Sequence, residues 1–525
     1  MSLFHVTRRG LLAAGTALAL TLGTVGGTQA QTPPGVLIVG QIAEPKALDP
    51  AAVTAVNDFR ILMNVYDGLV RYKDGTLEVE PALATDWDIS DDGTVYTFNL
   101  RDGVKFHDGS DFNAETVKFN FDRMLNEDHP YHETGPFPLA FFFSAVESTE
   151  VVDDLTVRFT LNAPYAPFLS NLAYPTGLIV SPAAVEQHGA GFGRNPSGTG
   201  PFTFAEWRSN EAVVIEANAD YWDGAPELQA VVFRPITDAN TRTAEMLAGG
   251  IDLMVEVPPV ALSEFQGDAY TVHEQAGPHV WFLILNAKEG PFADKRVRQA
   301  ANYAVNKEAL VNEVLEGTAE VAAGPTPPAF AWAYNPDLEP YPYDPERARA
   351  LIAEAGVEGA ELTFYVTEGG SGMLDPVAMG TAIQADLKAV GFDVKIETYE
   401  WNTFLGEVNP GLEGKADMAE MAWMTNDPDT LPFLALRTAA WPDQGGFNSG
   451  YYSNPEVDEL LEAARVATDQ DERARLYKEM QTIVQNDAPW VFVANWKQNA
   501  VTSDRVDSFA LQPSFFLLLD DVVKN

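Results

Sequence analysis

The chain alternates between short apolar segments with the two-residue period of a β-strand and longer segments with the period of a helix. The strand-like segments are rich in Val, Ile and aromatic residues, and turn-forming residues separate them from their neighbours. They are 36–40, 95–100, 213–217, 230–233 and 280–285.

Helix-like segments lie between these strands, and their first residues are of the kind that caps helices. Asn113 and Asp294 each precede apolar residues at helical spacing. Asp344-Pro345 and Asn454-Pro455 each combine a capping side chain with a proline at the first helical position. Gly356 predicts the end of the third of these helices. We therefore predict a mixed α/β (α+β) fold, with domains that interleave because no repeat or low-complexity linker separates them.

The N-terminus has the pattern of an export signal. Arg8 and Arg9 precede an apolar stretch at 11–22, and small residues lead to 28–30. A membrane-spanning helix needs about 20 apolar residues, so this stretch is too short to span a bilayer stably. We predict that 1–30 is a signal peptide. The adjacent arginines favour the twin-arginine route, with ordinary Sec export as the alternative.

The sequence contains no cysteine, which excludes disulfides, thiolate metal sites and the lipidated cysteine that tethers some exported proteins. We therefore expect a soluble periplasmic protein without a lipid anchor. The chain is strongly acidic, with 33 Lys+Arg against 76 Asp+Glu and a net charge of −43. Such a surface repels nucleic acid and anionic lipid, so we expect neither as a partner. The charge either steers a cationic ligand or keeps the protein in solution.

Motifs of the common enzyme classes are missing. There is no Gly-x-Ser-x-Gly elbow, Walker loop, dinucleotide fingerprint or His-Glu-x-x-His helix, and we predict neither enzymatic activity nor a cofactor. A secreted hydrolase that pairs two of the many carboxylates is the alternative from another class. His129, His132 and Glu133 are clustered, but Pro130 interrupts them, so we interpret this cluster as a surface loop rather than a metal site.

A set of longer motifs runs in order along the chain and includes turns between strands and proline-capped helix starts. These motifs are 81–87, 90–93, 96–98, 100–109, 198–202, 218, 221–222, 297–300, 303–305, 341–346, 452–458 and 488–490. Through them the chain resembles the large extracytoplasmic solute-binding proteins of the peptide/nickel class (family 5). The resemblance covers nearly all of the chain that follows the predicted signal.

The resemblance implies a two-lobed periplasmic binding protein fold of cluster C type, whose lobes close on a ligand about a hinge. The apolar strands at 280–285 and 490–494 would be the crossings between the lobes. The implied boundaries are 31–283 plus 490–525 for the first lobe, with an inserted subdomain at roughly 60–200, and 284–489 for the second lobe.

The resemblance also implies a function. The chain would be a monomer that captures a peptide-like small molecule (an oligopeptide, a glutathione-like peptide or an opine) and delivers it to an ABC permease in the inner membrane. Import of a nickel chelate or a sugar conjugate is the alternative. A chaperone or signalling receptor with the same fold would bind without import.

The block 421–429 contains the first candidate ligand contacts. In the family, the tryptophan of this block faces the cleft and an acid nearby holds a peptide amine. Trp423 matches that tryptophan, and an aromatic wall supplies apolar contact and cation–π attraction. The acid that holds the amine has no clean match, because the chain is shorter between Trp423 and Asp427 than in the dipeptide-binding pattern, and Asp427 instead matches an acid that is mostly structural in the family. We predict both as ligand contacts, with a packing role as the alternative for each.

A second group of candidates is Gly370, Ser371 and Met373. The resemblance aligns them with the place where dipeptide-type members carry an arginine for the ligand carboxylate. No arginine lies between Arg349 and Arg437, so a bidentate clamp is missing there. A Gly/Ser loop would instead bind an anion through backbone N–H groups.

Glu44 and Leu48 are the candidates from the first lobe. They lie in the loop 44–50, which follows the first strand and lines the cleft in the family. Ligands of α/β sheets bind at the carboxyl ends of strands, which supports this prediction. A simple connecting loop is the alternative.

Overall fold

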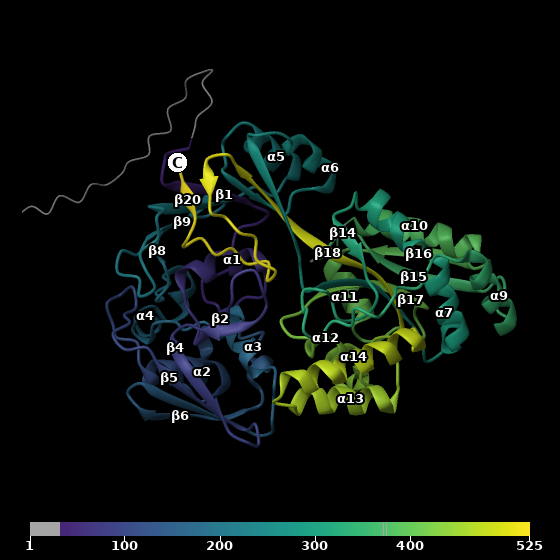
Figure 1. Cartoon of the computed structure of the whole chain (residues 1–525), viewed down its shortest axis with the longest axis horizontal. Helices are drawn as coiled ribbons and strands as arrows, with labels where there is room; N and C mark the ends of the chain where they lie inside the picture. Colours follow the sequence, from purple (N-terminus) through teal and green to yellow (C-terminus); the bar gives the residue numbers. More distant parts are fainter. Residues whose placement is uncertain (1–31, 371, 374) are drawn as a thin grey trace, which may run out of the picture.

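The computed structural model describes residues 32–370, 372–373 and 375–525. The predicted signal peptide at 1–30 and the candidate Ser371 lie outside the described residues. The predicted mixed α/β class is confirmed, because helices pack on a sheet of 12 strands and on smaller sheets (Figure 1). No helix of the described part combines the length and apolar character needed to cross a membrane.

The large sheet has two halves that share strand β18 (Trp490–Ser503). In the first half, β1 runs parallel to both of its neighbours, β10 and β11. The strands of this half are β8 (Phe202–Arg208), β9 (Ala212–Ala217), β10 (Ala230–Pro235), β1 (Val36–Gln41), β11 (Leu253–Val255) and β12 (Tyr270–Ala276). The strands predicted at 36–40, 213–217 and 230–233 are confirmed.

In the second half, β15 runs parallel to β16 and β17, and β13 runs antiparallel to β17 and β18. The strands of this half are β16 (Asp393–Tyr399), β15 (Glu361–Thr367), β17 (Met418–Met424), β13 (His279–Leu285) and β14 (Ala319–Val321). The 14 residues of β18 pair with β13 near one end and with β11 and β12 near the other, and Figure 1 shows this strand passing between the halves. The predicted lobe boundaries stay a prediction.

Strand β13 shows how the sheet is covered. All of its residues are buried, and alternate side chains belong to two different cores. The Phe282 ring stacks on Trp490 with 4.0 Å between centroids. Leu283 points to the other face, into the core that helices α7, α9 and α10 cover. A strand buried on both faces loses the polar alternation of a surface strand, which explains the continuous apolar run of its sequence.

The helices begin where their capping residues predict. Asp294 caps α7 through the backbone N–H of Arg296, and Asp344 caps α9 through that of Arg347. Gly356 ends α9 in the left-handed conformation, at φ 70°. The main helices are α1 (Val56–Val65), α5 (Ala239–Leu247), α7 (Lys295–Ala304), α9 (Pro345–Ala355), α10 (Pro376–Ala389), α13 (Pro455–Val466) and α14 (Gln470–Asp487).

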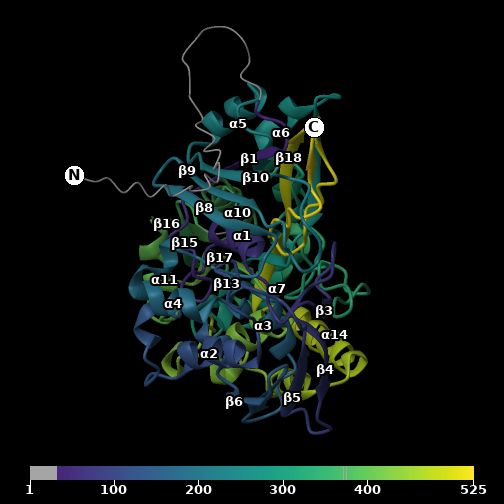
Figure 2. The ribbon, with the colours of Figure 1, turned by 90° about the vertical axis from the view of Figure 1, so that its left-hand side faces the viewer.

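A separate four-stranded antiparallel sheet lies within the range predicted for the subdomain. Its order is β4 (Ala84–Ile89), β5 (Val95–Leu100), β7 (Thr156–Leu161) and β6 (Val146–Asp153). Helix α2 (Ala114–Leu125) covers one face, where Phe121 meets Phe159 edge to face at 4.8 Å. Figures 1 and 2 both show this sheet at the end of the molecule opposite α5.

The subdomain also contacts the second half of the large sheet. Ser170 and Asn171, in helix α3 (Phe168–Ala173), bond to Asp427 and Asn426 at 2.9 and 2.7 Å. The backbone N–H of Ala166 donates to the carbonyl of Arg465 at 2.8 Å. These polar contacts lie apart from the β18 connection.

Candidate functional site

The candidate residues gather where parallel strands end. In the second half, β16, β15 and β17 end next to one another, at Tyr399, Thr367 and Met424. In the first half, β1 ends at Gln41 between its parallel neighbours. The carboxyl ends of parallel strands are where α/β sheets bind ligands, so the structure provides one such edge in each half.

Trp423 is the next-to-last residue of β17, and its backbone lies opposite Val280 of β13. Its side chain is half-buried and meets the Phe447 ring at 5.5 Å with an interplanar angle of 72°. Phe447 is itself 39% exposed. The two rings together form an aromatic surface that packs partly against the core and stays partly exposed.

Gly370 follows β15 and supports a second aromatic surface. A Cβ at this position would lie 2.3 Å from the ring of Trp401, so only glycine allows the ring to pack there. Trp401 begins helix α11 (Trp401–Val408) and stacks on Phe404 at 5.8 Å and 13°. Gly370 thus positions an aromatic ring, and its predicted ligand contact stays a prediction.

Core packing and a histidine hydrogen bond fix the rest of this loop. Met373 is 7% exposed and packs in the core against α10, so its role as a ligand contact stays a prediction. The carbonyl of Gly372 accepts a hydrogen bond from His279 Nε2 at 2.8 Å. His279 Nδ1 in turn accepts from the backbone N–H of Trp496 at 3.3 Å. His279 therefore joins the loop to β13 and β18.

The protonation state of His279 follows from its position. The side chain is 2% exposed, and burial lowers its pKa to about 4, so the ring is neutral at neutral pH. A neutral ring with one donor and one acceptor matches its two partners. Sequence reasoning missed both His279 and Trp401, because their importance comes from contacts with residues far away in the chain.

Asp427 lies at the contact with the subdomain, and both of its oxygens are engaged. Oδ1 pairs with Arg473 at 2.8 Å and accepts from the Asp429 N–H at 2.9 Å, and Oδ2 accepts from Ser170 at 2.9 Å. The side chain is 1% exposed. This geometry supports the packing role that the sequence left open, and ligand contact by Asp427 stays a prediction.

The two first-lobe candidates differ in exposure. Glu44 is half-buried, and its Oε1 accepts from the indole N–H of Trp207 at 2.6 Å. Leu48 is fully buried, and its backbone bonds to Gly193 and Tyr66 at 2.8 and 2.7 Å. Of the two, only Glu44 presents side-chain surface in this arrangement, and ligand contact by either residue stays a prediction.

Two buried polar side chains lie close in sequence to this loop. Gln41 ends β1, and neither atom of its amide has a hydrogen-bond partner within the described residues. The same holds for Asp58 Oδ2, whereas Asp58 Oδ1 accepts from the Lys46 N–H at 2.9 Å. Burial raises the pKa of Asp58 to about 6. Buried polar atoms are normally satisfied by protein, water or ligand, so this edge has unused hydrogen-bonding capacity.

Comparisons with known proteins bear on the family of the chain and on its fold. Residues 78–444 match the family described as bacterial extracellular solute-binding proteins, family 5 Middle. Heme-binding protein A of Haemophilus influenzae is 36% identical over 89% of this chain and 88% of its own length. Glutathione-binding protein GsiB of Pectobacterium atrosepticum is 33% identical over 99% of both chains.

A solved structure is similar over nearly the whole chain. It is the ABC transporter-associated periplasmic binding protein DppA from Helicobacter pylori in complex with the peptide STSA. The two proteins are 34% identical, with a TM-score of 0.77 over 93% of this chain and 98% of the other. The predicted resemblance to family 5 is therefore confirmed.

Proposed function

Because the chain belongs to the family-5 bacterial extracellular solute-binding proteins, we propose that it captures a peptide-like solute for an ABC importer. The observation that carries this proposal is Trp423, a half-buried aromatic at the carboxyl end of a parallel-sheet strand. Beside it, the Phe447 ring extends the apolar surface, and Trp401 adds an aromatic ring next to Gly370 at the end of β15. In the first half of the sheet, Gln41 and Asp58 have buried polar atoms without partners among the described residues, which would accept the ligand's hydrogen bonds or donate to it.

The ligand class follows from the charges at this edge. Segment 350–436 contains no arginine, so the loop around Gly370 lacks the planar guanidinium that would clamp a free carboxylate there. Without this clamp, a larger or differently charged peptide-like solute, such as an oligopeptide, a glutathione-like peptide or an opine, is favoured over a free dipeptide. The similarity to a glutathione-binding protein and to a peptide-bound protein supports this class.

The cellular role follows from the same proposal. The protein acts as a monomer in the periplasm after removal of residues 1–30, has no lipid anchor and delivers its solute to a membrane permease. It carries out no chemistry on the solute. The absence of cysteine is consistent with the missing lipid anchor.

Ligand-dependent stabilisation of the purified protein tests the proposal. A solute present at 100 times its Kd stabilises the native state by about 2.7 kcal/mol, which a thermal unfolding assay detects. The library should contain di- and oligopeptides, oxidised and reduced glutathione, opines, sugar conjugates, haem and nickel chelates. Native mass spectrometry of protein taken from its host would identify a retained solute. If no member of the library raises the melting temperature and no retained solute is found, the proposal fails.

A pair of tryptophan variants locates the site. Trp423→Ala should weaken binding of the identified solute roughly tenfold, or about 1.4 kcal/mol. Trp87→Ala is the matched control, because Trp87 is also half-buried but lies in β4 of the subdomain. If both variants lose the same affinity, or neither loses any, the binding site does not include Trp423.

A further inference from the structure

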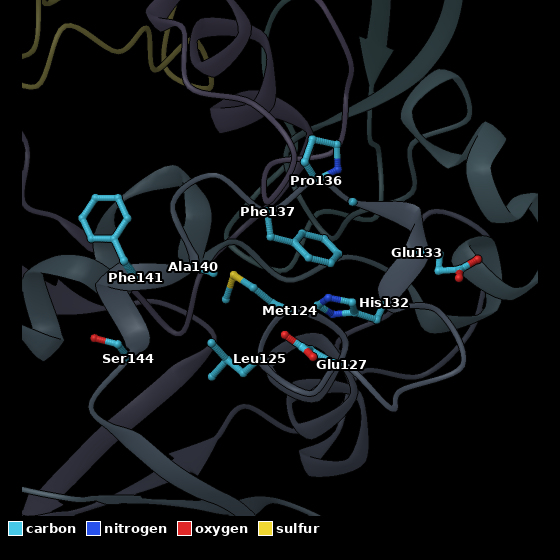
Figure 3. Close-up of a pocket in the computed structure, with 11 residues that line it drawn as sticks. Met124, Leu125, Glu127, His132, Glu133, Pro136, Phe137, Ala140, Phe141 and Ser144 are labelled. Carbon is cyan, nitrogen blue, oxygen red and sulfur yellow. The ribbon is translucent and has the colours of Figure 1, made fainter. Parts of the chain in front are cut away.

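A large cavity lies in the subdomain, outside the strand ends described above. Its volume is about 670 Å³, and all the residues that line it come from one stretch of chain, 124–144 (Figure 3). None comes from the predicted second lobe, so the cavity is complete without lobe closure. The sequence had suggested only a surface loop here.

One side of the cavity is apolar. It is lined by Met124 and Leu125, at the end of α2, and by Phe137 and Phe141, which follow in the chain. Phe141 is 50% exposed, although the surface of this protein is otherwise rich in acidic side chains. Ligand pockets are lined mainly by apolar and aromatic side chains, as this side of the cavity is.

The polar side of the cavity contains His132 in a fixed tautomer. Its Nδ1 lies 3.0 Å from the carbonyl oxygen of Arg123, and a carbonyl can only accept, so Nδ1 carries the proton. In the neutral ring, Nε2 is then an acceptor. Figure 3 shows the His132 ring and the Glu127 carboxylate toward the same part of the cavity, next to Phe137. The His132 and Phe137 rings are 5.4 Å apart.

Arg123, whose carbonyl accepts the hydrogen bond from His132, is itself held in place by its side chain. The Arg123 guanidinium forms a buried pair with Asp49, with N–O distances of 3.0 and 3.1 Å. It also lies 5.3 Å from the centroid of the Phe137 ring. His132 and Phe137 are therefore positioned without a ligand, which lowers the ordering cost of binding at these two residues.

A metal ion does not suit this cavity. Within the described residues, no group of three or more His, Cys, Asp or Glu side chains could hold one. An acceptor nitrogen, a carboxylate and an aromatic face instead match an ammonium group, which has three donors and a positive charge.

We propose that this cavity binds a small molecule with a protonated amine on an aromatic or apolar body. The amine donates to His132 Nε2 and to the Glu127 carboxylate, while the body lies against Met124, Phe137 and Phe141. The net charge of −43 favours the approach of such a cation. This site is distinct from the proposed solute site and does not depend on it.

Calorimetric titration of the full-length mature protein with 2-phenylethylamine tests the proposal. The wild-type protein should bind this amine and should bind 3-phenylpropionate and N-acetyl-2-phenylethylamine at least tenfold more weakly. His132→Phe keeps an aromatic ring but removes the acceptor, and should weaken amine binding at least tenfold. Glu127→Gln should weaken it severalfold, and because Glu127 is exposed, this variant should fold even if the His132 variant does not.

Two controls complete the experiment. His188→Phe changes another half-buried histidine, at the end of α4 (Pro182–His188), and should leave amine binding unchanged. Trp423→Ala should also leave it unchanged. The proposal is overturned if wild-type protein does not bind the amine, if the carboxylate binds as well as the amine, or if both pocket variants bind like wild type. It is equally overturned if Trp423→Ala removes binding, because the amine would then occupy the solute site.

Discussion

Replacing Lys307 by methionine should stabilise this protein, and the gain should depend on pH in a defined direction. Lys307 begins α8 (Lys307–Ala309) and is 4% exposed. Its ammonium donates to Asn302 Oδ1 at 3.3 Å and lies 5.7 Å from the centroid of the Tyr341 ring. No carboxylate among the described residues pairs with it. Burial lowers its pKa from 10.5 to about 7.

The magnitude follows from this pKa. At about 1.4 kcal/mol per pKa unit, lowering the pKa from 10.5 to about 7 costs about 5 kcal/mol of folding free energy. Below pH 7 the folded protein carries the whole cost. Between pH 7 and 10.5 the unfolded chain binds more protons than the folded one, so wild-type stability rises with pH. Methionine removes the cost and loses one hydrogen bond of about 1 kcal/mol. Lys307→Met should therefore gain about 3 to 4 kcal/mol at pH 7.

Denaturant unfolding at pH 6.5, 8 and 9.5, followed by circular dichroism, measures this difference. The gap between Lys307→Met and wild type should shrink by about 1.4 kcal/mol per pH unit above pH 7. Lys388→Met is the control, because Lys388 is an exposed lysine on α10 and its replacement should change stability by less than about 0.5 kcal/mol. A gap that stays constant with pH, or a variant that is less stable at pH 7, would refute the reasoning.

Three further predictions concern the candidate site. The pKa of His279 is lowered to about 4 from 6.5, so its stabilising contribution should be lost as pH falls from about 6.5 to 4, at a cost of about 3 kcal/mol. Unfolding measured across this range should show a smaller pH dependence in His279→Gln, and an equal dependence would contradict the assignment. Gly370→Ala should displace Trp401 and cost about 1–3 kcal/mol, visible as a change in tryptophan fluorescence; an unchanged spectrum and stability would argue against the close packing. Asp427→Asn leaves Arg473 without its buried partner and should cost about 3–5 kcal/mol in thermal unfolding, whereas a loss below 1 kcal/mol would mean that the pair is solvated.

Local signals predicted much of the fold. The caps at Asp294, Asp344 and Asn454 mark helix starts because the side chain bonds to backbone only two or three residues away. The apolar run at 280–285 predicted a buried strand from its composition alone. How β18 joins the two halves of the sheet could not be predicted in this way. Its partners in β11, β12 and β13 lie more than two hundred residues away along the chain, as Leu253 does from Thr502, and no local pattern encodes their register.

The candidate site residues also differ in whether a local sequence signal or only a long-range contact identifies them. Trp423 could be identified from a motif, and the structure places it at a strand end. His279 has no distinguishing neighbours in sequence, and only its contacts with Gly372 and Trp496 reveal its role. His132 was noticed in the sequence, but the carbonyl that fixes its tautomer belongs to Arg123, on a different element.

The position of β18 has a consequence for biosynthesis. This strand fills the space between β11 and β13, yet it leaves the ribosome after all the other strands of the large sheet. Until residues 490–503 are available, both neighbours are left with an unpaired edge, and such edges can pair with other chains. The sheet is thus completed only after all of its other strands have been made, and a transcript truncated before β18 should yield an aggregating product rather than a smaller folded domain.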